Sequence, residues 1–125
     1  MNTRAVDLSK ITIDQLVDRF AEIGVAQDDA LWGSKYARFK RLFEQMNEVD
    51  LELRSRGAEA RRALLRLYNH RNIQVRLKAA KRTLAVAPIE ARRLIEDISR
   101  SGFYPQAGEA GMTLSNLDEG IFKPD

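Results

Sequence analysis

The stretch that decides the fold is residues 58–99, AEARRALLRLYNHRNIQVRLKAAKRTLAVAPIEARRLIEDIS. Apolar residues recur in it every three or four positions, which is the spacing of one face of an α helix. The polar residues 69–72 interrupt this pattern, and Asn72 is suited to cap the helix that follows. Pro88 is suited to the first position of another helix, where its missing N–H costs nothing. The stretch therefore predicts three helices, over residues 58–68, 72–86 and 88–100.

A short motif occurs twice within this stretch. Residues 59–62 (EARR) recur as residues 90–93, 31 positions later. Two apolar positions that follow the motif also match, because Leu64 aligns with Ile95 and Leu67 aligns with Ile98. A repeat of about this length, made of two helices and a turn, is typical of an α-solenoid.

The order of residues also resembles a known repeat family. The leucine-rich residues 64–67 (LLRL), the polar turn 69–72 (NHRN) and the helix start 75–80 (VRLKAA) together resemble a HEAT repeat. The whole chain resembles a small bacterial family of HEAT-like proteins whose function is uncharacterised. The resemblance implies an all-α fold: a short right-handed α-solenoid of about five to six antiparallel helices with the HEAT-like repeat in the centre. HEAT turns usually carry an aspartate where this sequence has Asn69, so an inter-repeat ladder of aspartate and arginine is not implied.

Two helices are predicted before the repeat. Thr12 and Gln15 have the spacing of a capping box, so we expect a helix over 12–24 that ends at Gly24. A longer helix is expected over 29–56, with an apolar face that we interpret as core, although aromatic residues also line ligand pockets. The members of this face are Trp32, Tyr36, Phe39, Phe43, Met46, Val49 and Leu53.

The C-terminal residues 101–125 are expected to form an irregular cap with a possible short helix over 110–117. Four glycines and two prolines in this segment weaken any prediction of a longer helix. A solenoid exposes its last apolar face unless something covers it, so we expect the segment to fold back as a lid. A tail in solvent is the alternative. The chain is thus predicted to be a single all-α domain over 1–125.

The composition excludes several kinds of functional site. The 125 residues include no cysteine and one histidine, which excludes disulfides, zinc–cysteine sites and thiol nucleophiles. His70 lies in a polar turn, and the acidic pairs at 28–29 and 118–119 are ordinary helix-end residues. We therefore expect no catalytic site, cofactor or metal. No apolar run approaches the roughly 18 residues of a membrane span, and no signal peptide is evident, so the expected location is cytoplasmic.

The net charge of +3 at pH 7 is unevenly distributed along the chain. Residues 1–53 carry a net charge of −3, residues 54–100 carry +9, and residues 101–125 carry −3. The basic middle is either a surface for an anionic partner or is neutralised by the acidic ends within the same fold.

Polar and cationic residues of the predicted 72–86 helix lie opposite its apolar face. In HEAT-like arrays the second helix of each pair lines the concave surface, so the resemblance places these residues there. A solvated helix face is the alternative. Arg76 is different, because we expect its guanidinium to bond to turn carbonyls or to acids of a neighbouring helix. The candidate partner-binding residues are Arg71, Gln74, Lys78, Lys81 and Arg82.

Two functions remain compatible with these patterns. The first is a non-enzymatic protein–protein interaction module that presents a basic helical surface to an acidic or amphipathic partner. The alternative is a nucleic-acid-binding helical repeat protein that uses residues 54–100. We prefer the first, because the acidic ends would repel a phosphate backbone and because no exposed aromatic residue is expected to alternate with the basic ones. No membrane partner is expected, and the sequence leaves the oligomeric state open.

Overall fold

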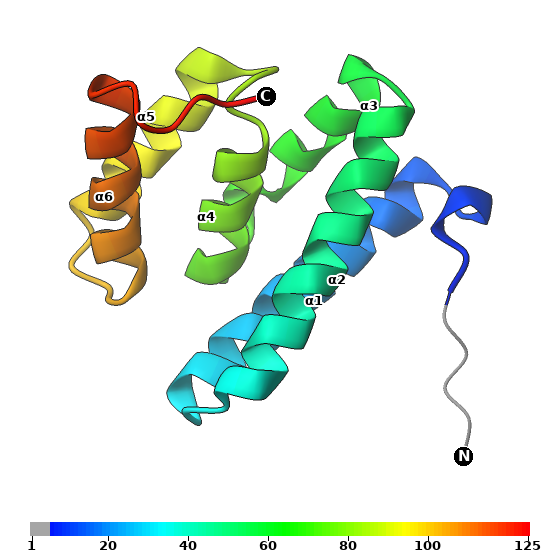
Figure 1. The fold of residues 1–125 in the computed structure, drawn as a ribbon, viewed down its shortest axis with the longest axis horizontal. Helices are drawn as coiled ribbons and strands as arrows, with labels where there is room; N and C mark the ends of the chain where they lie inside the picture. The colour runs from blue at the N-terminus through cyan, green and yellow to red at the C-terminus, as the bar shows by residue number, and fades with distance from the viewer. Residues whose placement is uncertain (1–5) are drawn as a thin grey trace.

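The structure is a computed structural model that describes residues 6–125 (Figure 1). These residues contain six α helices, two 3-10 helices and no β-strand, so the predicted all-α class is confirmed. The elements in chain order are η1 (Leu8–Lys10), α1 (Ile13–Trp32), α2 (Tyr36–Ser55), α3 (Ala58–Arg62), η2 (Ala63–Asn69), α4 (Ile73–Arg82), α5 (Pro88–Ser99) and α6 (Gln106–Asp118).

Helix α1 begins where the capping box predicts. The Gln15 backbone N–H donates to the Thr12 hydroxyl over 3.1 Å, and the Thr12 N–H donates to the Gln15 side-chain oxygen over 2.9 Å. The predicted end at Gly24 is wrong, because α1 continues to Trp32. Gly24 is buried, and a Cβ placed on it would lie 2.8 Å from Cγ2 of Val75 on α4. The absence of a side chain at Gly24 therefore permits α1 and α4 to pack closely, and Gly24 does not end a helix.

Helix α2 is shorter than the helix predicted over 29–56. Residues 29–32 belong to α1, and Ser34 adopts a positive φ of 54° in the turn between the two helices. The chain thus reverses direction at residues 33–35, within the range predicted as one helix. Met46, Val49 and Leu53 are fully buried, as the predicted apolar face requires.

The first part of the predicted apolar face is not core. The side chains of Trp32 and Tyr36 are 79 % and 74 % exposed, and Met46 is the first buried residue of α2. Figure 1 shows the reason, because the α1–α2 hairpin projects beyond the end of α4, and no other helix packs over its tip. The interpretation of these two aromatic residues as core is therefore wrong.

The repeat stretch forms α3, η2, α4 and α5. Asn72 caps α4 as predicted, since its side-chain oxygen accepts hydrogen bonds from the N–H groups of Gln74 and Val75. Helix α4 ends at Arg82, four residues before the predicted end, and a turn leads to Pro88 at the first position of α5. The helix predicted over 58–68 is an α-helical turn followed by a 3-10 helix.

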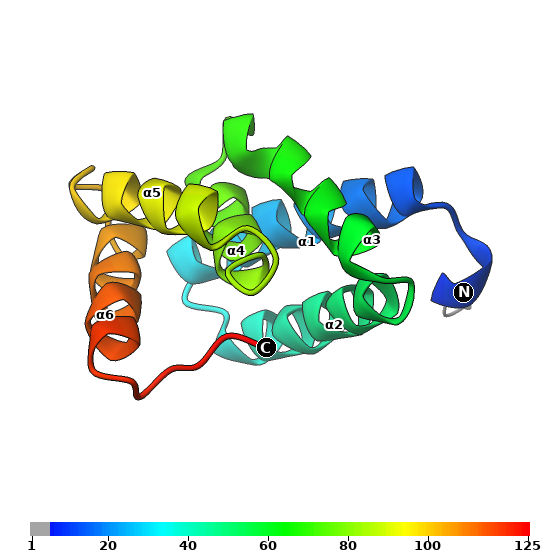
Figure 2. The same ribbon diagram turned by 90° about the horizontal axis from the view of Figure 1, so that it is seen from above.

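Two apolar clusters form the interior, and α4 contributes to both. Val75 and Ala79 pack into a cluster built mainly by α1, α2 and η2. Leu77 and Ala80 pack into a second cluster with residues of α5 and α6. Seen from above in Figure 2, α4 accordingly lies in the middle of the other helices.

The C-terminal segment is more regular than predicted. It contains the 13-residue helix α6, which packs against α5 and buries Ala110, with Leu114 and Leu117 partly buried against the second cluster. After α6 the chain crosses over α4 towards α2, as Figures 1 and 2 show. Phe122 on this return segment also packs against the second cluster.

Candidate anion-binding cleft

The five candidate partner-binding residues do not form one exposed stripe. Arg71 is exposed in the turn before α4, but Gln74 is only 1 % exposed. The Gln74 side-chain amide donates to Gln27 of α1 over 3.1 Å, and its oxygen accepts from Gln106 of α6 over 2.9 Å. Gln74 therefore ties three helices together inside the protein, and its expected position on an open surface is wrong.

Lys78 and Lys81 face α6 and share one carboxylate. Their ammonium nitrogens lie 2.7 Å and 3.0 Å from Oε2 of Glu109. Burial would raise the pKa of Glu109, but attraction to the two lysines outweighs burial and lowers it. For Lys78, burial lowers the pKa, and the attraction of Glu109 offsets only part of that effect. Lys78 is buried rather than exposed as expected, so only Lys81 of this pair reaches solvent appreciably.

Arg82 faces α2. Its guanidinium donates to Oδ2 of Asp50 over 3.2 Å and to the side-chain oxygen of Asn47, and it lies 5.6 Å from the centre of the Phe43 ring. Asp50 is buried, and its second oxygen has no hydrogen-bond partner within residues 6–125. Half of the Asp50 carboxylate therefore remains available for a further donor.

These contacts explain why the cationic face of α4 is not a free surface. Helix α4 lies between α2 and α6, so its polar face meets Asp50 from the acidic N-terminal part and Glu109 from the acidic C-terminal part. Neutralisation within the fold thus accounts for three of the cations. The structural role expected for Arg76 is confirmed, because its guanidinium donates to the His70 carbonyl over 2.7 Å.

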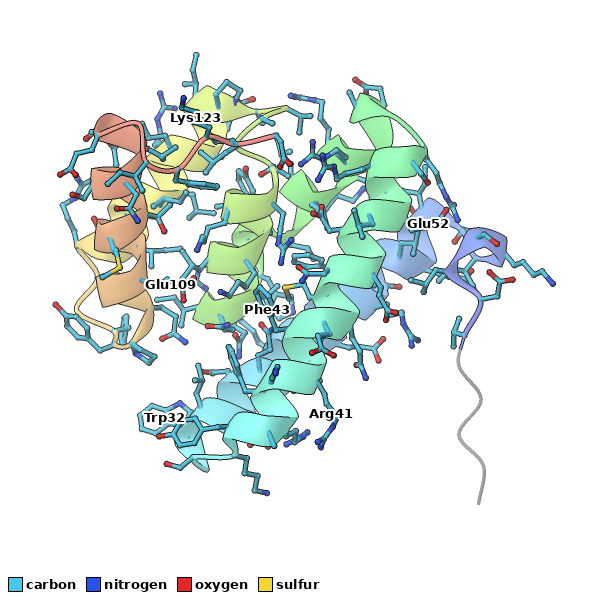
Figure 3. The ribbon with its side chains drawn as sticks, viewed as in Figure 1. Trp32, Arg41, Phe43, Glu52, Glu109 and Lys123 are labelled. Carbon is cyan, nitrogen blue, oxygen red and sulfur yellow. The ribbon has the colours of Figure 1, made fainter. Side chains whose placement is uncertain are left out.

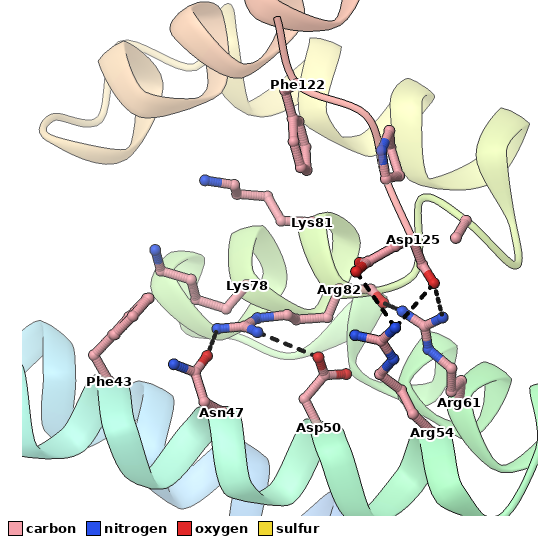
Figure 4. A pocket seen from close by; sticks show the side chains of 12 residues that line it. Phe43, Asn47, Asp50, Arg54, Arg61, Lys78, Lys81, Arg82, Phe122 and Asp125 are labelled. Atoms are coloured by element: carbon pink, nitrogen blue, oxygen red, sulfur yellow. Dashed lines mark hydrogen bonds and ion pairs between the residues drawn. The ribbon is translucent and has the colours of Figure 1, made fainter.

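A cleft of about 260 Å³ lies between α2, α4 and the return segment (Figure 4). Five cationic side chains line it, against the carboxylates of Asp50 and Asp125, so its lining has a net positive charge. The cations are Arg54, Arg61, Lys78, Lys81 and Arg82.

Arg61 is the most unusual group in this cleft. It is only 9 % exposed, and its guanidinium donates to the main-chain oxygens of Arg82 and Asp125 over 3.0 Å and 3.2 Å. Its Nε has no hydrogen-bond partner, and no aspartate or glutamate side chain of residues 6–125 lies within ion-pair distance of it. A buried cation is costly unless a counter-charge accompanies it, and here the guanidinium has main-chain oxygens as its hydrogen-bond acceptors.

Arg54 lies beside Arg61 and contacts the same residue. Its Nη2 is 3.2 Å from the main-chain oxygen of Asp125 and 3.4 Å from that residue's carboxylate. The two arginines therefore hold one acidic residue between them, as Figure 4 shows. Such a pair of guanidinium groups suits a carboxylate, since each presents several N–H donors in one plane.

Sequence reasoning missed the most important residues of this cleft. Arg61 was noted only as part of the repeated motif, and the sequence around it does not distinguish it from the neighbouring Arg62, which is more exposed. The contributions of Asp50 and Glu109 had no local signal, because both are distant in sequence from the cations that they contact.

The other polar groups considered in the sequence have structural contacts. The Asn72 N–H donates to Nδ1 of His70, Asp28 accepts hydrogen bonds from Asn72 and Gln106, and Asp118 pairs with Arg92. Among residues 6–125, no three histidine, cysteine, aspartate or glutamate side chains gather as a metal ion would require. None of the helices in the described range has both the length and the apolar character needed to cross a membrane.

Comparisons with known proteins place the chain in a family. A search of curated proteins gave no match. The crystal structure of the protein RPA1889 from Rhodopseudomonas palustris CGA009 is similar, with 51 % sequence identity and a TM-score of 0.93 over 97 % of this chain and 100 % of that chain. The family model described as "Domain of unknown function (DUF2019)" matches residues 14–118, which include the α2 and α4 walls of the cleft. The chain therefore belongs to the DUF2019 family.

Proposed function

We propose that this protein is a non-enzymatic binding module whose cleft takes up an acidic segment of a partner protein. The observation that carries this proposal is Arg61, a buried guanidinium that lines the cleft and pairs with no aspartate or glutamate side chain among the described residues. An incoming carboxylate would supply the missing counter-charge, and charge-assisted hydrogen bonds of this kind are stronger than neutral ones.

The rest of the cleft supports the same choice of ligand. Glu109 is shared between two lysines, and Asp50 is engaged by Arg82, so the internal carboxylates do not match the number of cations. Lys78, Lys81 and Arg82 from the predicted binding set line this cleft, whereas Gln74 and Arg71 do not. An acidic peptide is therefore favoured over a neutral or cationic one.

We further propose that the helices after α2 form two stacked HEAT-like units, α3–η2 with α4 and α5 with α6. The repeated arginine supports this arrangement, because Arg61 donates to the carbonyl of Arg82 at the end of α4, and Arg92 pairs with Asp118 at the end of α6. In each unit an arginine of the first helix thus contacts the last residue of the second. Binding to partners through side-chain surfaces is typical of such solenoids.

Nucleic-acid binding is the second candidate, and one observation favours it. Trp32 and Tyr36 are exposed at the tip of the α1–α2 hairpin, next to Lys35, although they lie outside the basic residues 54–100. Figure 3 shows Trp32 at that tip, away from the cleft. Stacking of bases on such side chains is a common mode of single-strand binding.

The two candidates are separated by titrating fluorescent ligands into the protein at low ionic strength. We expect a hexaglutamate peptide to bind, and Arg61→Gln to weaken its binding about tenfold, which corresponds to one charge-assisted hydrogen bond. Arg54→Gln provides a second, more exposed variant of the same pair. Arg100→Gln is the matched control, since it removes the same charge from an exposed residue paired with Asp97.

Each outcome of this titration is informative. Equal binding by the wild-type protein and both cleft variants would exclude the cleft as the site. Tight binding of an oligothymidylate that is lost in Trp32→Ala, without any binding of hexaglutamate, would favour the nucleic-acid function instead. Circular dichroism of each variant confirms that a loss of binding is not a loss of fold.

A further inference from the structure

The return segment Ile121–Asp125 forms one wall of the cleft and contacts its arginines. The main-chain oxygen of Asp125 accepts hydrogen bonds from Arg54 and Arg61, and its carboxylate lies 3.4 Å from Arg54. At the other end of the segment, Phe122 is half-buried and lines the same cleft. An apolar contact and an acidic contact therefore hold the segment at two points.

The side chains of the segment other than Phe122 are open to solvent, although the N–H groups of Ile121 and Phe122 donate to the Asn116 carbonyl over 2.9 Å and 3.1 Å. Ile121, Lys123 and Pro124 are exposed, and the Asp125 side chain is 82 % exposed despite its ion pair. An ion pair with so much solvent access contributes little to stability. The segment also lies outside the part of the chain that the DUF2019 family model matches, whereas Arg54 and Arg61 lie inside it. The segment is therefore held by a small number of contacts at Phe122 and Asp125 and by its hydrogen bonds to Asn116.

We propose that Ile121–Asp125 is an intramolecular occupant of the cleft, and that the partner's acidic segment carries the same pattern. That pattern is a large apolar side chain followed three residues later by an acidic residue. Three residues of extended chain span about 10 Å, which is the reach that joins the Phe122 contact to the arginine pair. This inference rests on the proposed function, because it names the partner of the same cleft.

The covalent link makes the segment a strong competitor. A tethered ligand has an effective concentration on the order of millimolar, so an external segment with the same contacts must exceed that concentration to displace it. The apparent affinity of the full chain for a partner is therefore lower than the intrinsic affinity of the cleft. A partner gains over the occupant only through additional contacts with the cleft wall, where Lys81 is partly exposed but is already paired with Glu109.

The test uses a five-residue peptide with the sequence IFKPD, acetylated and amidated so that the aspartate side chain is its only carboxylate. Its binding is measured by NMR titration of the full-length protein and of the double variant Phe122→Ala/Asp125→Lys. We expect the peptide to bind the double variant at least about tenfold more tightly than the wild type, because the variant loses the Phe122 contact and the Asp125 carboxylate, and places a cation beside Arg54 and Arg61. Asp125→Lys alone is a second variant that leaves the apolar contact of Phe122 intact.

The matched control is Ile121→Ala/Glu119→Lys, which makes the same kinds of change at two exposed neighbours that contact neither arginine. A peptide with the sequence IKPFD has the same composition but places its aromatic and acidic residues side by side. We expect the control variant to bind IFKPD as weakly as the wild type does, and IKPFD to bind the double variant more weakly than IFKPD does.

The results separate this inference from the proposed function. If hexaglutamate binds in an Arg61-dependent manner while IFKPD binds the wild type and the double variant equally, the occupant is refuted and the proposed function stands. Equal affinity of IFKPD and IKPFD for the double variant would refute the pattern. If neither IFKPD nor hexaglutamate binds any form of the protein, both proposals are refuted.

Discussion

Gly24 lies in the middle of α1, and its replacement by alanine should destabilise the protein. In an ordinary helix interior this change stabilises by roughly 0.5–1 kcal/mol, because glycine loses more backbone entropy on folding. Here the new Cβ would lie 2.8 Å from Cγ2 and 3.2 Å from Cα of Val75. Val75 is fully buried and β-branched, so neither its side chain nor its backbone moves away easily.

The expected net effect of Gly24→Ala follows from these two opposing terms. Overpacking a well-packed core costs about 1–3 kcal/mol, which exceeds the gain in helix propensity. We therefore expect the free energy of unfolding to fall by about 1 kcal/mol, measured by urea denaturation followed by circular dichroism.

Gly111 provides the matched control on α6. A Cβ at this position meets nothing within 4 Å, so Gly111→Ala should stabilise the protein by about 0.5–1 kcal/mol. In a Val75→Ala background the clash is removed, and Gly24→Ala should then become stabilising as well. If Gly24→Ala stabilises the otherwise wild-type protein as much as Gly111→Ala does, the close contact of α1 and α4 is not present.

Three further predictions follow from the same structure. Glu109→Gln should lower the free energy of unfolding by about 2 kcal/mol, because it leaves Lys78 buried without a carboxylate. The expected loss is smaller than for a fully buried ion pair, because Glu109 is partly exposed. The folded-state pKa of Glu109 lies below its ordinary value of 4.5, so its contribution to stability should be fully present above pH 4.5 and lost as the pH falls through the folded-state pKa. Urea midpoints of wild type and Glu109→Gln that differ equally at all acidic pH values would contradict this. Asn72→Ala should cost about 1 kcal/mol through loss of the α4 cap, whereas a thermal melt indistinguishable from wild type would indicate that another group replaces the cap. Trp32 is the protein's single tryptophan, so acrylamide should quench its fluorescence nearly as well in the folded state as in urea, and a protected indole would show that the hairpin tip is covered.

The features that could be predicted from sequence depend on hydrogen bonds between near neighbours. The Thr12 capping box, the Asn72 cap and Pro88 at a helix start involve groups within three residues of one another, and all three are present. The apolar period also identified Met46, Val49 and Leu53 correctly as buried. Local spacing carries this information whatever the rest of the chain does.

The errors come from questions that only tertiary packing answers. A glycine is used both to end helices and to let helices approach, and nothing near Gly24 in sequence distinguishes the two uses. Apolar spacing placed Trp32 and Tyr36 on a helical face, but whether that face is covered depends on how far α4 extends beside it. The weak helical signal of residues 106–118 reflects glycines whose cost is offset by packing against α5.

The candidate site was predicted only in part for a related reason. The cations of α4 were recognised, but the carboxylates that contact them lie about 30 residues away in the chain, at Asp50 and Glu109. Charge balance over long segments indicated that neutralisation was possible without indicating where it occurs. Arg61, which is central to the cleft, pairs with no aspartate or glutamate side chain among residues 6–125, and the absence of a contact cannot be recognised in a sequence.

Because α4 contributes to both apolar clusters, the two clusters should not unfold independently. Val75 and Leu77 are two positions apart on one helix, yet they belong to different apolar clusters. Neither cluster can unfold without exposing to solvent apolar side chains of α4, the helix against which the other cluster packs. Denaturation should therefore be a single cooperative event, in which the amides of α4 are the last to exchange with solvent.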